Sequence, residues 1–325
     1  MRTPTQSLRV GVIRGGIGDE YEVSLSTGGS VLKHLPERHK SHDILITRDG
    51  VWHWQGLPIE PKQLAGRVDL IFNALHGEYG EDGQVQGVLD EAGLPYTGAG
   101  RVPAKLAMDK SAAKQIFARE GLFVAPGMII EPDEEPVAAA KRVFLAISPF
   151  WIVKPLNGGS SVGVAVARTL SELAQAIATS RQSATRLLVE RLISGREATC
   201  GVVDDFRGRE HYALPPIEIR RPSGKSFWDY QDKYSGATSE ICPGNFSAEE
   251  KGMIEEAAVV AHKALGLRHY SRTDFILTPK RIYVLETNAL PGLTSESLLP
   301  KAIAAVGCPY PQFLDHILAL TVENR

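Results

Sequence analysis

Apolar residues recur along the first hundred positions in two alternating patterns. Short apolar runs predict strands at 8–13, 43–47 and 69–75, and apolar positions at helical spacing predict helices at 23–35 and 85–92. A glycine turn, Gly15-Gly16-Ile17-Gly18, separates the first strand from the first helix. Strands that alternate with helices are typical of an open α/β sheet. The pattern therefore predicts an N-terminal α/β domain over residues 1–103.

The rest of the chain predicts two further domains of the α+β kind. Strands are expected near 128 and at 151–154, 162–167, 186–192, 198–203, 216–220, 273–277 and 282–286, and helices at 110–120, 138–145 and 248–265. We expect residues 104–191 to form an antiparallel sheet that carries helices, and residues 192–325 to form the third domain. Residues 222–244 are polar and have no periodicity, which is uncommon in a compact domain unless the stretch is a lid or a binding loop.

Composition narrows the classes of function. The chain has 325 residues, of which 43% are hydrophobic, and this is more than one hydrophobic core usually organises. The formal net charge of −2 gives no field that would attract nucleic acid or anionic lipid, so a small ligand is the better expectation. Cys200, Cys242 and Cys308 lie far apart, which argues against a disulfide framework or a zinc site. Neither a signal peptide nor an apolar run of about 18 residues occurs, so we expect a cytoplasmic protein.

Polar side chains on the last two predicted strands have the spacing of a metal site. Asp274 lies on one strand, and Glu286 and Asn288 lie two residues apart on the next, so the latter two face the same side. Carboxylate and amide oxygens suit Mg²⁺ held jointly with nucleotide phosphates. The alternative is a solvated strand end with ordinary polar residues.

A glycine and serine loop at 157–161 follows the strand that ends at Lys154. Its backbone N–H groups and the lysine could hold a phosphate, although such a turn is more often a plain hairpin. The loop also matches the G-x-S-x-G pattern of a hydrolase with Ser161 as nucleophile, but a strand and not the required helix is expected to follow. Residues 223–226 end like a Walker loop, yet Ile219 stands where that motif needs glycine.

Six groups of residues carry a family resemblance. They are His76-Gly77 with Gly80-Glu81-Asp82-Gly83, Met108-Asp109-Lys110, Val153-Lys154-Pro155 with Gly159-Ser160-Ser161-Val162-Gly163, Asp229-Tyr230 with Lys233-Tyr234, Arg272 with Asp274, and Glu286-Thr287-Asn288 with Pro291-Gly292. In their order and spacing they resemble the ATP-grasp ligases, and specifically the D-alanine–D-alanine ligase family. The resemblance runs over nearly the whole chain and implies an ATP-grasp fold, in which the second and third domains clasp ATP.

The resemblance implies an ATP site and a metal site. The ATP-binding residues would be Lys110, Lys154, Ser161, Glu190, Arg191, Ile193, Glu197 and Lys233. Lys110 and Lys154 would contact phosphates, residues 190–193 would form the hinge that holds adenine, and Glu197 would bind the ribose. Each lysine could instead be a solvated surface residue. The three polar residues of the predicted metal site map onto ligands that usually hold two Mg²⁺ ions, for which Mn²⁺ could substitute.

The resemblance also implies a site for two amino acids. Its residues would be Glu20, His76, Ser160, Tyr234, Arg272, Gly292, Ser297 and Leu298. Glu20 would receive the ammonium group of the first substrate and form a hydrogen-bonded set with Ser160 and Tyr234, which gives the polar loop the task of a lid. Glu20 could instead be a helix cap, and Glu22 competes for its role.

The remaining implied roles concern the reacting carboxyl groups. His76 would lie near the carboxyl end of the first substrate, unless it is only a structural donor. Arg272 and the N–H of Gly292 would stabilise the oxyanion of the tetrahedral adduct. Ser297 and Leu298 would receive the carboxylate of the second substrate.

The implied reaction joins two D-alanine molecules. ATP would phosphorylate the first, and the amine of the second would attack the acyl phosphate, giving a dipeptide for peptidoglycan precursor synthesis. The resemblance implies a cytoplasmic homodimer and leaves D-serine open as second substrate, whereas Tyr234 favours D-alanine over D-lactate. The alternatives are an ATP-grasp ligase for other amino acids and a nucleotide-binding regulator without turnover.

Overall fold

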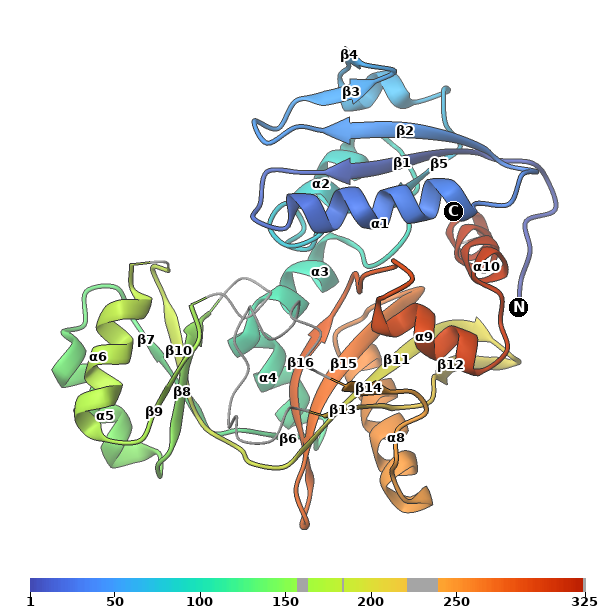
Figure 1. Ribbon diagram of the computed structural model, residues 1–325. Coiled ribbons are helices and arrows are strands. Elements are labelled where there is room, and N and C mark those ends of the chain that lie inside the picture. Colours follow the sequence, from blue (N-terminus) through green and yellow to red (C-terminus); the bar gives the residue numbers. More distant parts are fainter. Residues whose placement is uncertain (157–162, 183, 221–238, 324–325) are drawn as a thin grey trace.

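The computed structural model describes residues 1–156, 163–182, 184–220 and 239–323. Within these residues the strands form three sheets, of which the N-terminal one lies above the central and C-terminal ones in Figure 1. The predicted mixture of α/β and α+β architecture is therefore confirmed. None of the described helices is long and apolar enough to cross a membrane.

The N-terminal sheet has the strand order β4-β3-β2-β1-β5. Its elements are β1 (Arg9–Gly15), α1 (Tyr21–His34), β2 (Lys40–Ile46), β3 (Trp52–Trp54), β4 (Leu57–Pro58), the short 3-10 helix η1 (Pro61–Leu64), β5 (Leu70–Asn73) and α2 (Gln84–Glu91). β1 pairs in parallel with β2 and β5, as expected of an α/β sheet, whereas β2, β3 and β4 pair antiparallel. The sequence did not predict β3 and β4, because strands of two or three residues leave no periodic signal.

A glycine lets the chain leave β1 at the edge of the cavity described below. Gly15 has a φ of +93°, and an added Cβ would lie 2.2 Å from the carbonyl oxygen of Ile46. The N–H of Gly15 donates to Ser24 Oγ, and this hydroxyl donates to the carbonyl of Ala74. The turn and the first part of α1 are thereby fixed against the ends of β1 and β5.

The central sheet has the strand order β7-β10-β8-β9 and is antiparallel, as predicted. Its strands are β7 (Gly127–Ile130), β8 (Trp151–Pro155), β9 (Ala165–Ala167) and β10 (Leu187–Arg191), and its helices are α5 (Pro136–Ala146) and α6 (Leu170–Ser180). Trp151, Val153 and Val189 point to one face and form a core with the two helices. Because side chains alternate along a strand, Lys154 and Glu190 project from the opposite face.

The C-terminal sheet has the strand order β14-β13-β11-β15-β16-β6, with β12 paired to β11. Its strands are β6 (Phe123–Val124), β11 (Arg196–Phe206), β12 (Arg209–Ala213), β13 (Ile217–Arg220), β14 (Ser239–Ile241), β15 (Tyr270–Leu277) and β16 (Ile282–Asn288). The helices of this part are α3 (Arg101–Met108), α4 (Lys110–Arg119), α8 (Ala248–Ala264), α9 (Leu298–Ala305) and α10 (Tyr310–Glu323). The predicted strands at 198–203, 273–277 and 282–286 are confirmed within these elements.

α4 packs on the C-terminal sheet although it precedes the central one in the chain. Its buried Ala113 and Phe117 belong to the core formed by α8, β11 and β15. The side chain of Asp109 accepts hydrogen bonds from the N–H groups of Ser111 and Ala112 and so caps the start of α4. The domain boundaries at 103 and 191 stay predictions.

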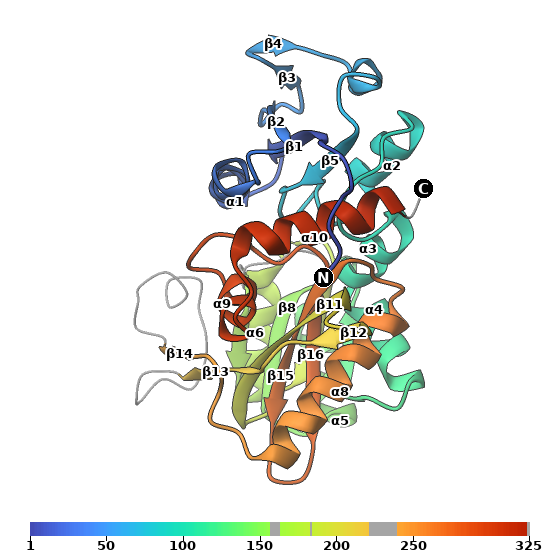
Figure 2. The ribbon, with the colours of Figure 1, turned by 90° about the vertical axis from the view of Figure 1, so that its right-hand side faces the viewer.

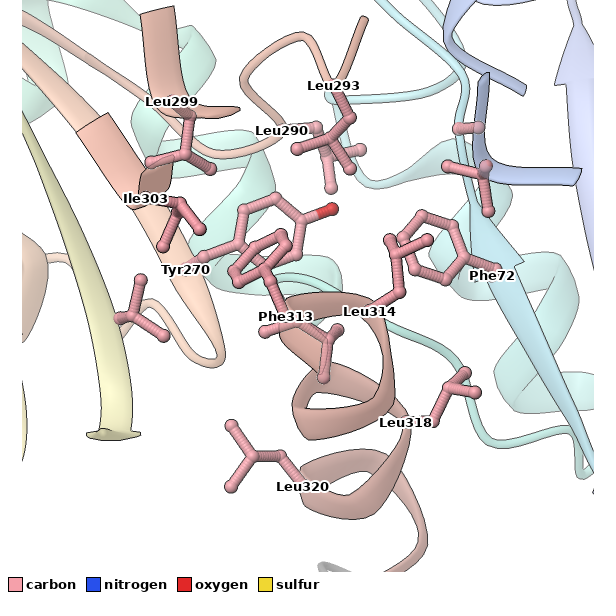
Figure 3. Close-up of a cluster of buried hydrophobic side chains, with 14 of the residues drawn as sticks. Phe72, Tyr270, Leu290, Leu293, Leu299, Ile303, Phe313, Leu314, Leu318 and Leu320 are labelled. Atoms are coloured by element: carbon pink, nitrogen blue, oxygen red, sulfur yellow. The ribbon is translucent and has the colours of Figure 1, made fainter. Parts of the chain in front are cut away.

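The largest core joins the N-terminal sheet to the C-terminal one through α10 (Figure 2). Phe313 and Leu314 of α10 lie between Tyr270 of β15 and Phe72 of β5 (Figure 3). The rings of Tyr270 and Phe313 meet edge to face with their centroids 6.0 Å apart. The last helix of the chain thus holds two sheets in a fixed relation, and the cavity between them depends on this packing.

Candidate active site

A cavity of about 1160 Å³ lies where the three sheets meet. Every residue that the sequence assigned to a site, and that the structure describes, lines this cavity. These residues are Glu20, His76, Lys110, Lys154, Glu190, Arg191, Ile193, Glu197, Arg272, Asp274, Glu286, Asn288, Gly292, Ser297 and Leu298. Ser160, Ser161, Lys233, Tyr234 and the part of the polar stretch at 222–238 lie outside the described residues.

The predicted metal ligands lie on two paired strands. Asp274 of β15 is directly opposite Glu286 of β16, and Arg272 is opposite Asn288. A register shift follows Asp274. The guanidinium of Arg272 donates to both oxygens of Asp274, each at 3.0 Å, and Thr199 Oγ1 donates to Asp274 Oδ1 at 2.5 Å. Burial alone would lower the pKa of the Arg272 guanidinium, but the negative charge of Asp274 has the larger effect, so the pKa is raised.

The donor set fits a divalent cation that prefers oxygen. Asp274 and Glu286 are only partly buried, with side chains 23% and 42% exposed, so both can face a ligand in the cavity. Asn288 Oδ1 accepts from the N–H of Leu290, which fixes the orientation of the amide, and an amide oxygen retains a second lone pair. Two carboxylates and one amide suit Mg²⁺ that is shared with phosphate oxygens.

Three lysines gather around two glutamates at the adjoining wall of the cavity, and one of them, Lys114, lies behind the lining residues. Lys154 Nζ lies 2.6 Å from Glu190 Oε2, and Lys114 Nζ contacts the other oxygen, Glu190 Oε1. Lys110 Nζ lies 3.6 Å from Glu286 Oε2. Burial alone would raise the pKa of Glu190, but the charges of Lys154 and Lys114 have the larger effect, so the pKa is lowered. Burial alone would lower the pKa of Lys154, but the charges of Glu190 and Glu286 have the larger effect, so the pKa is raised.

Lys154 is therefore a buried, paired cation and not a solvated surface residue. Only 11% of its side chain is exposed. A buried lysine needs a partner of opposite charge, and the sequence suggested a phosphate for this role. The structure shows that Glu190 is such a partner within the protein. Lys110 is also 11% exposed and lies at the start of α4. The alternative of simple surface solvation is wrong for both lysines.

The predicted hinge at 190–193 consists of the end of β10 and the start of the segment that connects the central sheet to the C-terminal sheet. β10 ends at Arg191, whose N–H donates to the carbonyl of Pro126, and Leu192 donates to Phe150. β11 of the C-terminal sheet begins at Arg196. Between them an added Cβ on Gly195 would lie 2.1 Å from the carbonyl oxygen of Leu277, so only glycine fits there.

An acidic corner lies at the other end of the cavity. Carboxylate oxygens of Glu20 and Glu81 and a ring nitrogen of His76 all lie within 4.8 Å of one another. His76 Nε2 lies 2.8 Å from Thr27 Oγ1, and His76 Nδ1 lies 3.6 Å from Glu81 Oε1. Glu20 is the N-cap residue of α1 and makes no side-chain capping hydrogen bond, so the alternative role that remains for it is an interaction of its charge with the helix dipole. The competing Glu22 is 76% exposed and pairs with Arg48, away from the cavity lining.

The last part of the lining is the approach to α9. Gly292 lies so close to Ser297 that an added Cβ would meet Ser297 Oγ at 2.8 Å. Ser297 is the N-cap of α9, and its hydroxyl oxygen accepts from the N–H of Thr294. The first N–H groups of a helix are unpaired within the helix and attract carboxylates. Leu298 is the first residue of α9.

Several residues in or next to this cavity were not predicted to have a role. Lys114, which lies behind the lining, is missing from the predicted set, although its spacing of four from Lys110 puts both on one helix face. Glu81 was quoted within a motif but received no role, and Thr199 carried no local signal. The hydrolase alternative at Ser161 loses support, because the described residues that follow form the strand β9 and not a helix.

Comparisons with known proteins agree with this arrangement. A family model described as D-ala D-ala ligase C-terminus matches residues 116–319, and one described as D-ala D-ala ligase N-terminus matches residues 53–99. The D-alanine–D-alanine ligase of Syntrophobacter fumaroxidans is 37% identical over 98% of this chain and 99% of its own. That of Desulfotalea psychrophila is 38% identical over 98% of this chain and 96% of its own.

Two solved structures have the same fold over almost their full length. The VanG D-Ala:D-Ser ligase from Enterococcus faecalis has a TM-score of 0.85 at 29% identity, covering 97% of this chain and 100% of that one. The D-alanine–D-alanine ligase from Bacillus anthracis complexed with ATP has a TM-score of 0.81 at 30% identity, covering 98% of each chain. With the fold, the cavity and the relatives in agreement, the chain belongs to the D-alanine–D-alanine ligase family.

Proposed function

We propose that this protein uses ATP to join two molecules of D-alanine, through an acyl phosphate, into the dipeptide used for peptidoglycan precursors. One observation carries the proposal. The site residues that the resemblance assigns come from the parts of the chain that build three separate sheets, and those that the structure describes line a single cavity. We also propose that the protein acts in the cytoplasm as a homodimer.

ATP would lie between the central and C-terminal sheets. The hinge segment at 190–193 would hold adenine, and Glu197 at the start of β11 would bind the ribose. Lys110 and Lys154 would bind the phosphates. Both side chains are only 11% exposed and lie beside carboxylates, so they have little conformational freedom to lose on binding. Ser161 and Lys233, which lie outside the described residues, would complete this site.

Asp274, Glu286 and Asn288 would hold Mg²⁺, or Mn²⁺ in its place, with two ions expected. A bound ion would neutralise the charge that develops on the transferring phosphoryl group. Thr199 would orient Asp274 through its hydrogen bond, and the guanidinium of Arg272 would remain beside the same carboxylate.

The first D-alanine would bind in the acidic corner, with its ammonium group at Glu20. His76 would lie at the carboxyl end, held in position by Thr27. Ser160 and Tyr234 are proposed to complete this set from segments outside the described residues.

The second D-alanine would present its amine to the acyl phosphate. Its carboxylate would bind at Ser297 and Leu298, where the N-terminus of α9 favours a negative charge. Attack places a negative charge on the former carbonyl oxygen, and Arg272 with the N–H of Gly292 would stabilise it. Donors of this kind contribute about 3 kcal/mol each in comparable sites. Collapse of the adduct releases phosphate and leaves the peptide bond.

Ligation of D-serine as second substrate is the alternative that an observation favours. The VanG D-Ala:D-Ser ligase shares the fold with a TM-score of 0.85 over 97% of this chain. Both functions use the same cavity and differ only where the second side chain lies.

The test is phosphate release from ATP and Mg²⁺, with D-alanine, L-alanine, D-serine and D-lactate offered singly and in pairs. We expect release that depends on D-alanine, with D-alanyl-D-alanine detected by mass spectrometry. A higher kcat/KM for the pair of D-alanine and D-serine than for two molecules of D-alanine would identify D-serine as the second substrate. Nucleotide binding without release for any pair would contradict the proposed reaction and leave the family assignment intact.

A further inference from the structure

A buried lysine outside the family's motif positions lies beneath the proposed phosphate site. Lys114 on α4 has a side chain that is only 8% exposed. Its ammonium contacts Glu190, whose side chain is 2% exposed, and the other oxygen of the same carboxylate contacts Lys154. Lys154 lines the cavity, whereas Lys114 does not. A single buried carboxylate therefore joins a cation that faces the ligand to a cation behind it.

The arrangement spans two sheets. Glu190 and Lys154 project from one face of the central sheet, on the paired strands β10 and β8. α4 packs with the C-terminal sheet through Phe117. The stem of Glu190 is confined as well, because an added Cβ on Gly127 would lie 3.0 Å from Glu190 Cγ. The ion pair of Lys114 and Glu190 thus crosses the junction at the base of the cavity.

We propose that Lys114 is a positioning residue of the nucleotide site, which acts through Glu190 to keep Lys154 oriented toward the phosphates and to leave the group with a net positive charge. This inference rests on the proposed role of Lys154. Two lysines and one glutamate have a formal sum of +1, whereas Lys154 and Glu190 alone would sum to zero. A neutral pair attracts a polyphosphate much more weakly than a cation does, particularly where solvent screening is low.

The ammonium group of Lys114 is needed because the charges of Lys154 and Glu190 are buried. Moving an ion out of water is costly unless an opposite charge compensates it. Glu190 compensates Lys154, but it also competes with the phosphates for that ammonium. Lys114 forms an ion pair with the other oxygen of Glu190, so the charge of the carboxylate is not balanced by Lys154 alone. When ATP binds, Lys154 can turn toward the phosphates without leaving Glu190 as an unpaired buried charge.

The experiment compares Lys114→Met, Lys114→Arg, Lys154→Met and Glu190→Gln in the full-length protein. The matched control is Lys141→Met, an exposed lysine on α5. Measured are the dissociation constant of ATP at fixed Mg²⁺ by calorimetry, the KM values of ATP and D-alanine, and the thermal unfolding temperature. We expect Lys114→Met to weaken ATP binding at least tenfold with the KM of D-alanine within twofold, and Lys114→Arg to retain most of the affinity.

A double-mutant cycle separates positioning from a general structural role. In the Glu190→Gln background Lys114 has no charge to balance, so adding Lys114→Met should change ATP affinity by less than twofold. An equal loss in both backgrounds would show that Lys114 does not act through Glu190 and would overturn the inference. So would a lowered unfolding temperature with unchanged ATP affinity, which would make Lys114 a structural tie only.

The failure of the inference is distinguishable from that of the proposed function. If Lys154→Met weakens ATP binding and Lys114→Met does not, the nucleotide site stands and the inference fails. If neither substitution changes ATP affinity while both proteins stay folded, the assignment of Lys154 to the phosphates fails, and the inference fails with it.

Discussion

Substitution of Glu286 by glutamine tests the chemistry of the cavity most directly. The change removes one negative charge from the proposed metal site and keeps nearly the same volume. Glu286 faces the cavity with its side chain 42% exposed, so the fold does not depend on its burial. We therefore expect an unchanged unfolding temperature and a large loss of activity.

The size of the loss follows from the charges that Glu286 would face. Two unit charges 4 Å apart interact by about 4 kcal/mol at the effective dielectric constant of a protein surface. A divalent ion doubles this, whereas the partial exposure of Glu286 and the retained amide oxygen reduce it. We expect a net loss of about 2–4 kcal/mol, which is about 30- to 900-fold in kcat/KM. The pair with Lys110 at 3.6 Å adds little, because it too is partly solvated.

The assay is phosphate release at saturating ATP and D-alanine over a range of Mg²⁺ concentrations. Glu286→Gln should shift half-maximal activation to higher Mg²⁺ and lower the maximal rate, and Glu286→Asp, which keeps the charge, should lie between it and the parent. Glu91→Gln, at an exposed position of α2, is the matched control. A normal Mg²⁺ response of the glutamine variant would remove Glu286 from the metal site and refute the electrostatic reasoning.

Three further outcomes are expected. Gly292→Ala should lower kcat about 100-fold or more at unchanged ATP affinity. The new Cβ would lie 2.8 Å from Ser297 Oγ, so the loop would have to shift and would move an oxyanion donor. A kcat of the purified variant within threefold of the parent would contradict this. Phe313→Ala should lower the free energy of unfolding by about 3–5 kcal/mol, measured by urea denaturation, because the ring is fully buried between two sheets. Burial lowers the pKa of His269 from 6.5 to about 3, so the unfolded chain takes up the proton first, and stability should fall by about 1.4 kcal/mol per unit as pH drops from about 6.5 toward 3. His269→Asn should flatten this slope in urea titrations at pH 7 and 5, and an unchanged slope would exclude His269 as its source. Asp204 lowers the stability further only below pH 3.8, because its pKa is lowered from 3.8 to about 2 in the folded protein. Burial alone would raise this pKa, but the interactions with His262 and His211 have the larger effect.

Local patterns in the sequence predicted most of the regular elements and the spacing of the proposed metal ligands, whereas the other site residues were predicted from the family resemblance. The period of two along β16 puts Glu286 and Asn288 on one face, and this required no knowledge of the rest of the chain. The short strands β3, β4 and β6 were not predictable, because two or three residues are too few to show a repeating hydrophobic pattern. α10 carries a buried face in the structure, but its partners on β5 and β15 lie far away in the chain.

The sequence by itself thus determined what each segment can form and which polar side chains share a face of a strand, because backbone geometry links local spacing to the facing of side chains. Only the tertiary structure decided which charges meet. Lys114 and Glu190 are 76 positions apart and come from segments that pack on different sheets. No local pattern encodes that pairing, since it depends on how α4, the central sheet and α10 bury their apolar faces together.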